Sequence, residues 1–265
     1  MLPPFGIFAF HNNPMRMTRL FSLLLALIFP LLLVAQNFKD TTMSLHMVAF
    51  HVSGHMPGGD LGKRYGSFTG VGASHFYKSA SNWIIQPEFS YFSGSTLKDT
   101  TLFDNIKDEN GQFISMYGEF ADVSVYMRGF YAGIKGGKLF PVFGPNPNSG
   151  LMILGSVGFL QHKTFIYQET KDVPLLNGDY QKGWDHLSNG LATSQFIGYL
   201  HLDNNRPVNF YAGFEFHQAW TKNRRDWNFD LMGPDDRQYR DLSFGIKIGW
   251  IFPINKKSTS TYYYF

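Results

Sequence analysis

The 265-residue sequence contains no cysteine, which excludes both a disulfide framework and a lipidated N-terminal cysteine. Its charge is almost balanced, with 23 Lys and Arg residues against 20 Asp and Glu residues. Nucleic-acid binding needs a clear basic excess, so we expect no nucleic-acid partner. After residue 35, no apolar run is long enough for a transmembrane helix. The nine histidines show no metal-ligand spacing, and we therefore predict no metal and no cofactor.

The N-terminus is typical of a secretory signal peptide. Arg16 and Arg19 precede an apolar run over residues 20–34, which ends in "LLLVAQN". A basic region, an apolar core and a small residue before the cut define such a signal. We expect cleavage between Ala35 and Gln36.

Two alternatives bear on this segment. Met17 is a second candidate start, because the sequence from Met17 onward is already a complete signal. A transmembrane anchor is the other interpretation, but Pro30 interrupts a run that is shorter than the roughly 20 residues a span requires. Removing the leader leaves 21 basic residues against 20 acidic ones, because only Arg16 and Arg19 are lost.

Apolar and polar residues alternate over several later segments of the chain. In "VNFYAGFEFHQAW", Phe210, Phe214 and Trp220 share one face, while Glu215 and His217 share the other. The segments "WIIQPEFSYF", "ADVSVYMR" and "LSFGIKIGWIF" alternate in the same way. A soluble β-sandwich also alternates. Here the minority face is small, rich in glycine and sparsely charged, which favours the interior of a narrow membrane barrel.

The spacing of these segments predicts an antiparallel transmembrane β-barrel. We expect eight strands, near residues 43–53, 67–78, 83–92, 117–140, 150–168, 189–203, 208–220 and 241–252. The short connections are 79–82, the stretch around 143–150, and 204–207. The long connections are 54–66, 93–116, 169–188 and 221–240. This alternation is the outer-membrane pattern, with short turns toward the periplasm. The alternation slips after Arg128, so a bulge or an extra hairpin near Gly129, giving ten strands, is the alternative.

Five charged residues are predicted to face the interior of this barrel: Glu88, Asp122, Arg128, Glu215 and Lys247. Charges inside so narrow a barrel must be paired. Two interpretations of these charges are a structural salt-bridge network that fills the lumen and a path for ions. We favour the structural network.

The chain closes on "STSTYYYF", with four aromatic residues: Tyr262, Tyr263, Tyr264 and Phe265. Pro253 opposes a simple extension of the last strand, because proline cannot donate a ladder hydrogen bond. We favour a separate periplasmic tail that meets a partner. The alternative is an extension of the final strand that the barrel-assembly machinery reads through its terminal aromatic residue.

The leader ending in "VAQ", the cysteine-free small barrel and the aromatic tail resemble the small outer-membrane β-barrel proteins of the Bacteroidota. That group includes the accessory barrels of the type IX secretion system. The resemblance implies a non-enzymatic accessory subunit of an envelope assembly or secretion machine, located in the outer membrane. Its expected partners are another envelope protein, outer-membrane lipid and lipopolysaccharide. We expect a signal peptide at 1–35, the barrel at 36–252 and the tail at 253–265. A small-solute channel is a third interpretation, which the strand number disfavours.

The motif "DHLSNG" at 185–190 resembles the lipid A 3-O-deacylases, which are eight-stranded barrel hydrolases. That resemblance implies His186 as general base and Ser188 as nucleophile, with Glu215 as the nearest glutamate to orient the histidine. Gly190 departs from the alanine expected there, and the two dozen residues that follow contain no Glu. We favour the alternative, a loop-to-strand junction in which "SNG" supplies turn residues.

The motif "NRRDWNFD" at 223–230 combines Arg225, Trp227 and Phe229 in the fourth long connection. Two interpretations stay open for it. It either holds lipopolysaccharide phosphates or anchors the rim at the membrane interface.

Overall fold

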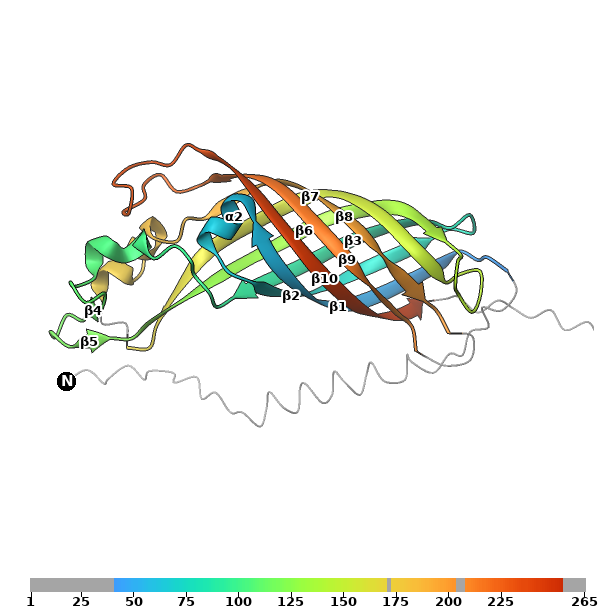
Figure 1. Cartoon of the computed structure of the whole chain (residues 1–265), viewed down its shortest axis with the longest axis horizontal. Coiled ribbons are helices and arrows are strands. Elements are labelled where there is room, and N and C mark those ends of the chain that lie inside the picture. The colour runs from blue at the N-terminus through green and yellow to red at the C-terminus, as the bar shows by residue number, and fades with distance from the viewer. Residues whose placement is uncertain (1–40, 171–172, 204–207, 255–265) are drawn as a thin grey trace, which may run out of the picture. The chain divides into compact units, whose positions relative to one another are not determined.

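The computed structural model describes residues 41–170, 173–203 and 208–254. Eight strands close into an antiparallel barrel in the order β1-β10-β9-β8-β7-β6-β3-β2 (Figure 1). Their bounds are β1 Leu45–Gly58, β2 Phe68–Lys78, β3 Trp83–Gly94, β6 Val123–Phe140, β7 Gly150–Gln168, β8 Ser188–His201, β9 Phe210–Asn223 and β10 Gln238–Ile254. The predicted eight-stranded barrel is confirmed. The predicted signal peptide and the "YYYF" tail lie outside the described residues.

The alternative of a bulge or an extra hairpin near Gly129 is wrong. Strand β6 pairs with β3 and β7 through this position, where Gly129 faces Phe92 on one side and His162 on the other. The two further strands, β4 Phe113–Ile114 and β5 Phe120–Ala121, form a separate two-stranded sheet in a long connection. They add a hairpin outside the barrel, so the ten-stranded alternative is wrong.

The barrel closes through β1 and β10, which pair from His46 with Ile254 to Gly58 with Leu242. Pro253 lies within β10 opposite Met47, so the expectation that the last strand stops at residue 252 was wrong. The amide of Ile251 donates to the carbonyl of Asn209 on the β9 side. Backbone amides two residues apart point to the same side, and β9 begins at Phe210. Pro253 therefore turns its missing donor toward the β9 side, beyond the last described pair of that ladder, Trp250 with Phe210.

Period-2 alternation decides which side chains fill the barrel. On β9, Tyr211, Glu215 and Thr221 are buried, whereas Phe214 between them is 66% exposed. Glycine permits close packing where large rings enter. A Cβ on Gly249 would lie 2.2 Å from the ring of Tyr211, so this position admits no side chain while the tyrosine fills the lumen.

The long connections lie at one end of the strands and carry short helices (Figure 1). These are α2 Gly59–Arg64, η2 Thr101–Ile106, η3 Pro174–Leu176 and η4 Tyr180–Gly183. We use the name loop cap for residues 95–122, 173–187 and 224–237. Its apolar core contains Leu102, Phe103, Phe113, Val173, Leu176 and Trp184, together with Ile166 of β7. The long connections are therefore packed against one another.

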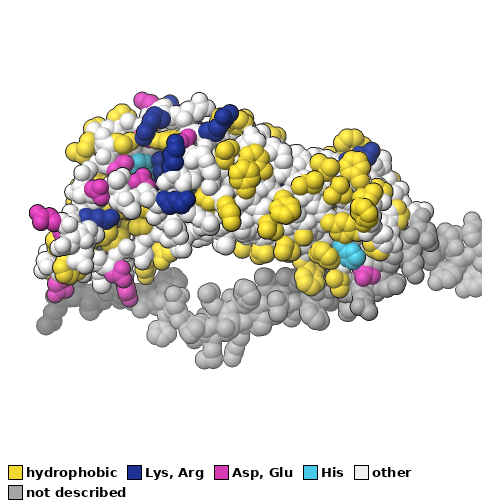
Figure 2. All heavy atoms as spheres, viewed as in Figure 1, with side chains coloured by type: hydrophobic (Ala, Val, Ile, Leu, Met, Phe, Trp, Pro, Cys, Tyr) yellow, Lys and Arg dark blue, Asp and Glu magenta, His cyan; other side chains and the backbone are white. Residues whose placement is uncertain are grey.

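The outward face of the barrel is apolar. Phe50, Trp83, Ile134, Phe214 and Ile246 are each more than half exposed to solvent in the isolated chain. Figure 2 shows hydrophobic side chains spread over the strands, with most charged side chains gathered toward the loop end. No helix among the described residues has the length and apolarity to cross a bilayer.

Closure pairs the backbone groups of the strands, and the apolar exterior suits hydrocarbon. The chain is an outer-membrane β-barrel.

Candidate functional site

Four charged side chains from four strands meet in the middle of the lumen. They are Glu88 on β3, Lys135 on β6, Glu215 on β9 and Lys247 on β10, and we call them the lumen cluster. Lys135 Nζ lies 2.9 Å from Glu88 Oε2 and also pairs with Glu215 Oε1. Lys247 Nζ lies 2.6 Å from Glu88 Oε1 and 2.7 Å from Glu215 Oε2. Each lysine bridges both carboxylates.

The electrostatics of the lumen cluster require all four members. Their side chains are at most 2% exposed, so water screens them little. Burying a single charge without a partner costs roughly several kcal/mol. The charges of the two lysines and the two glutamates sum to zero, so no charge in the cluster is left without a partner. Additional donors satisfy Glu88, since Gln86 Nε2 and Ser90 Oγ lie 3.3 Å and 3.2 Å from its carboxylate oxygens.

Three of the five predicted interior charges, Glu88, Glu215 and Lys247, do meet here. The structure contradicts the prediction for Asp122 and Arg128. Asp122 is exposed between β5 and β6, and Arg128 lies on the outward face with Cζ 3.4 Å from the centroid of the Phe165 ring.

The alternation of β6 is inverted relative to the prediction because its first residues lie at the loop cap. There Val123 and Val125 pack against the apolar core of the cap, so the inward face is apolar and the polar residues face out. The same inversion explains why Lys135 was missed. Buried Tyr131 and Leu139 lie on its face, and extending period 2 between them would have found it.

Apolar layers fill the lumen on both sides of the lumen cluster. Toward the short turns, the layer is formed by Leu45, Met47, Ala49, Phe76, Ile84, Leu139, Met152, Leu154, Phe196, Leu200, Leu202, Tyr211 and Ile251. Toward the loop cap, it is formed by Leu61, Tyr65, Phe68, Phe92, Met127, Tyr131, Leu160, Ala192 and Ala219. Ions crossing such layers would lose their hydration, so the filled lumen argues against a channel.

Three potential metal ligands come together that the sequence spacing did not reveal. The donor atoms of His55, Glu215 and His217 lie within 4.8 Å of one another, and all three residues are buried. Glu215 and His217 share a strand face, whereas His55 comes from β1. Lys135 and Lys247 already neutralise Glu215, and their ammonium groups oppose a further cation.

The hydrolase residues inferred from "DHLSNG" do not assemble. The hydroxyl of Ser188 donates to the backbone carbonyl of His186 at 3.0 Å, and Ser188 is fully buried. The ring of His186 pairs instead with Asp230 at 2.9 Å, and its backbone adopts a positive φ of 45°. Glu215 belongs to the lumen cluster, bonded to Lys135 and Lys247. The predicted triad was therefore wrong in its geometry.

Ion pairs fix the fourth long connection to the third at the rim. The guanidinium of Arg225 donates to both carboxylate oxygens of Asp185, at 2.8 Å and 2.5 Å. Donating these hydrogen bonds to the Asp185 carboxylate raises the pKa of Arg225. In the same motif, Phe229 packs against the core of the cap while Trp227 is 49% exposed. The motif thus anchors the loop cap through Arg225 and Phe229.

A second loop pairing involves Asp235. Burial raises the pKa of its carboxyl group, but hydrogen bonds from Arg237 and Tyr239 outweigh this effect and lower the pKa to about 2. Arg237 Nε lies 2.9 Å from Asp235 Oδ1. The carboxylate therefore connects the fourth long connection to the start of β10.

The hairpin at 113–121, which we call the loop hairpin, presents apolar side chains to solvent. Ile114 is 49% exposed, Met116 65%, Tyr117 72% and Phe120 70%. Phe113 anchors the hairpin, since it is 8% exposed and packs 5.6 Å from the ring centroid of Phe103. The hairpin carries β4 and β5, far from the short-turn end of the barrel (Figure 1).

No family model matches this chain, and no curated protein sequence matches it. Among solved structures, the chain is similar to Ail, the attachment invasion locus protein of Yersinia pestis, at 8% identity and a TM-score of 0.43, over 79% of this chain and 99% of that one. It is also similar to Neisserial surface protein A at 9% identity and a TM-score of 0.39, over 77% and 96%. A third is the outer membrane protein OprG from Pseudomonas aeruginosa, at 12% identity and a TM-score of 0.32, over 82% and 99%. The assignment to the outer membrane rests on the closed sheet and apolar exterior of the chain itself.

Proposed function

We propose that this outer-membrane barrel is a non-enzymatic accessory subunit, which holds the loop cap in place for another envelope protein to bind. The observation that carries the proposal is the set of apolar side chains exposed on the loop hairpin, above all Met116, Tyr117 and Phe120. Exposed apolar side chains gathered in one place mark interaction sites on proteins. These residues lie in the loop hairpin and not on a barrel strand, so they are separate from the apolar surface that the strands present to lipid.

The hairpin is held in one conformation before binding. Ser115 accepts at its carbonyl from Gly118 at 3.0 Å and donates from its amide to Glu119 at 2.8 Å. Phe113 packs into the cap core beneath these bonds. A preformed loop loses little entropy when a partner binds, and aromatic residues supply much of the energy of interfaces.

The filled lumen supports the same proposal. Two apolar layers and a neutral lumen cluster stiffen the barrel and occupy the space that a channel would need. An envelope assembly or secretion machine, of the type IX kind by the resemblance, is the proposed setting. The predicted aromatic tail, outside the described residues, is a second proposed contact on the periplasmic side.

Site-specific photo-crosslinking in the native membrane tests the proposal. We expect a crosslinker in place of Tyr117 to capture one discrete envelope protein, and we expect Met116→Ser with Phe120→Ser to remove that product. A crosslinker at exposed Asn110, in the preceding turn of the same connection, is the matched control. The double variant and the proteins carrying the crosslinker should all retain the heat-dependent gel mobility of a folded barrel. Equal capture at Tyr117 and Asn110, or capture that survives the double substitution, contradicts the proposal.

A further inference from the structure

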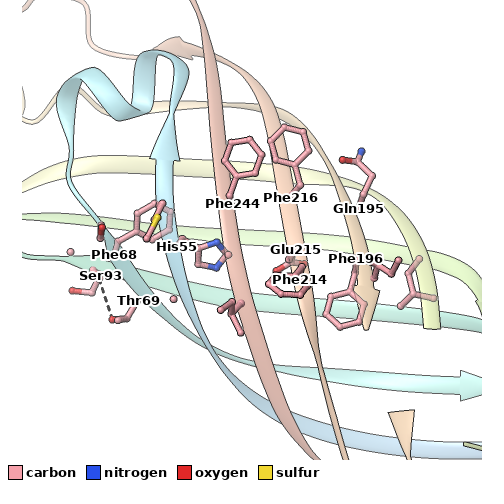
Figure 3. Close-up of a pocket in the computed structure, with 18 of the residues that line it drawn as sticks. His55, Phe68, Thr69, Ser93, Gln195, Phe196, Phe214, Glu215, Phe216 and Phe244 are labelled. Carbon is pink, nitrogen blue, oxygen red and sulfur yellow. Dashed lines mark hydrogen bonds between the residues drawn. The ribbon is translucent and has the colours of Figure 1, made fainter. Parts of the chain in front are cut away.

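Two depressions border the wall formed by β8, β9 and β10. One, of about 980 Å³, extends across residues of β1, β2, β3 and β7 as well, and its lining includes the outward-facing Phe214, Phe216, Phe244 and Ile246 beside buried residues such as Phe196 and Glu215. Figure 3 shows Phe216 and Phe244 projecting from their strands side by side, and their ring centroids lie 4.4 Å apart. The other, of about 410 Å³, is lined by Asn189, Gly190, Leu191, Trp220, Thr221, Lys222, Arg224, Asp236 and Gln238.

The two depressions share the outward face of β9. Phe214, Phe216, Trp220 and Lys222 are separated by even numbers of residues and therefore point to the same side of the strand. At about 3.3 Å per residue, Phe214 and Lys222 are roughly 26 Å apart along the strand. Along β9 the outward side chains are therefore first the phenylalanines, then the indole of Trp220, and finally the ammonium group of Lys222. This distance is comparable to the length of one lipid molecule. Trp at this position is typical of the membrane–water boundary.

The polar depression carries more positive than negative charge. Lys222 is 47% exposed, and its pair with Asp236 is long, at 3.5 Å, with the acid 87% exposed. Such a pair is weak and open to exchange with a ligand. Arg224 is oriented more firmly, because its Nε donates to Asn189 Oδ1 at 2.7 Å. Asn189 is in turn held by Gln161, with Nδ2 3.4 Å from Oε1.

The hydrogen bond to Asn189 uses Nε of Arg224, so the terminal nitrogens of its guanidinium group can bind an anion beside Lys222. Arg and Lys together are the usual donors to phosphate, the first through a planar fork and the second as a point charge. Two cations against one acid give the depression a net charge that favours an anionic group.

We propose that this wall holds a phosphate-bearing anionic lipid, with an acyl chain over Phe216 and Phe244 and the phosphate between Lys222 and Arg224. The stacked rings of Phe216 and Phe244 offer apolar contact to an acyl chain, and the polar depression offers cations to a phosphate. The proposal does not depend on the accessory role, because it concerns the membrane-facing wall and not the loop hairpin.

Native mass spectrometry of the barrel, reconstituted in phosphatidylcholine nanodiscs without a histidine tag, tests the proposal. The probe is bisphosphorylated lipid A added to the nanodiscs, and dephosphorylated lipid A is the comparison. We expect retention of the phosphorylated lipid, and a loss of apparent affinity of about tenfold or more in Lys222→Gln/Arg224→Gln, since each charge-assisted bond is strong. Phe216→Ser should also weaken retention.

The control variant is Lys138→Gln, an exposed lysine near the short-turn end of β6, which should bind as the unaltered protein does. Inorganic phosphate is added as a competitor. Displacement of the lipid by millimolar phosphate would show a site for the free anion and overturn the proposal. Equal retention of the dephosphorylated lipid, or unchanged binding by the double variant with its heat-dependent mobility intact, would overturn it as well.

Discussion

Lys135 on β6 and Glu215 on β9 form an ion pair across the lumen, although β7 and β8 separate their strands in the sheet. This contact spans the inside of the barrel and is independent of the backbone ladder. Together with Glu88 and Lys247 it ties four strands through side chains alone. The lumen cluster is thus a structural brace within the membrane-spanning part.

Replacing Lys135 with Met should destabilise the barrel by about 3–5 kcal/mol, because two buried carboxylates would share one remaining lysine. Urea unfolding in lipid vesicles, followed by gel mobility without boiling, measures the change. Lys135→Met combined with Glu215→Gln restores charge balance and should recover part of the loss.

The exposed Lys138 on the same strand supplies the control for this measurement. Lys138→Met should cost less than about 1 kcal/mol, since it removes an exposed charge whose cation–π contact is a long one, with Nζ 5.6 Å from the centroid of the Trp83 ring. Equal losses for Lys135→Met and Lys138→Met would contradict the brace.

The fourth long connection should become less protected in acid. The folded-state pKa of Asp235 is about 2, below the value of 3.8 for the free side chain, so the ionised form stabilises the loop. That contribution is complete above about pH 4 and disappears as the pH falls toward 2. At pH 6, Asp235→Asn should speed hydrogen exchange of residues 224–240 about fivefold, since a hydrogen bond is worth about 1 kcal/mol.

Exchange of the variant and the unaltered protein is compared at each pH, which cancels the intrinsic pH dependence of exchange. Near pH 2 the difference between them should shrink. A difference of the same size at pH 6 and pH 2 would show that the charge of Asp235 is not responsible.

Lipid A should remain intact when incubated with the barrel. Ser188 donates to the carbonyl of His186, and the imidazole is held by Asp230, so the hydroxyl lacks the base that a nucleophile requires. Mass spectrometry of released fatty acid should therefore find none for the unaltered protein or for Ser188→Ala. Substantial release that disappears in both Ser188→Ala and His186→Gln would reverse this conclusion.

Ser188→Ala also has an effect on stability that can be measured in parallel. Ser188→Ala should lower the free energy of unfolding by about 1 kcal/mol, since it removes one buried hydrogen bond. The expected result is a small loss of stability with no change in chemistry.

Much of this fold was predictable from local sequence. Alternation in "VNFYAGFEFHQAW" located β9 and the inward position of Glu215, because a side-chain period of two is a property of any extended strand. Alternating short and long connections determined the strand number and the end at which each loop lies. Glu88 and Lys247 were placed inside by the same periodicity.

Periodicity failed where long-range packing outweighs it. Asp122 and Arg128 were placed inside because their neighbours Val123 and Val125 are apolar, and apolar residues normally face lipid. At that end of β6 the neighbouring layer is the loop cap, whose core takes the valines and leaves the polar side chains outside. The prediction that the last strand ends before Pro253 was wrong for a similar reason. Whether a strand tolerates a proline there depends on where the neighbouring strand β9 begins, which the local sequence does not show.

The sequence by itself predicted a closed sheet with an apolar exterior, from the alternation of most strands combined with the order of short and long connections. Only the tertiary structure decided which charges meet. Lys135 and Glu215 are eighty residues apart and on strands that do not pair, so only the closure of the barrel brings them together. The pairing of His186 with Asp230 and of Pro253 with Met47 was decided in the same way, by loop packing and strand register, which no local pattern records.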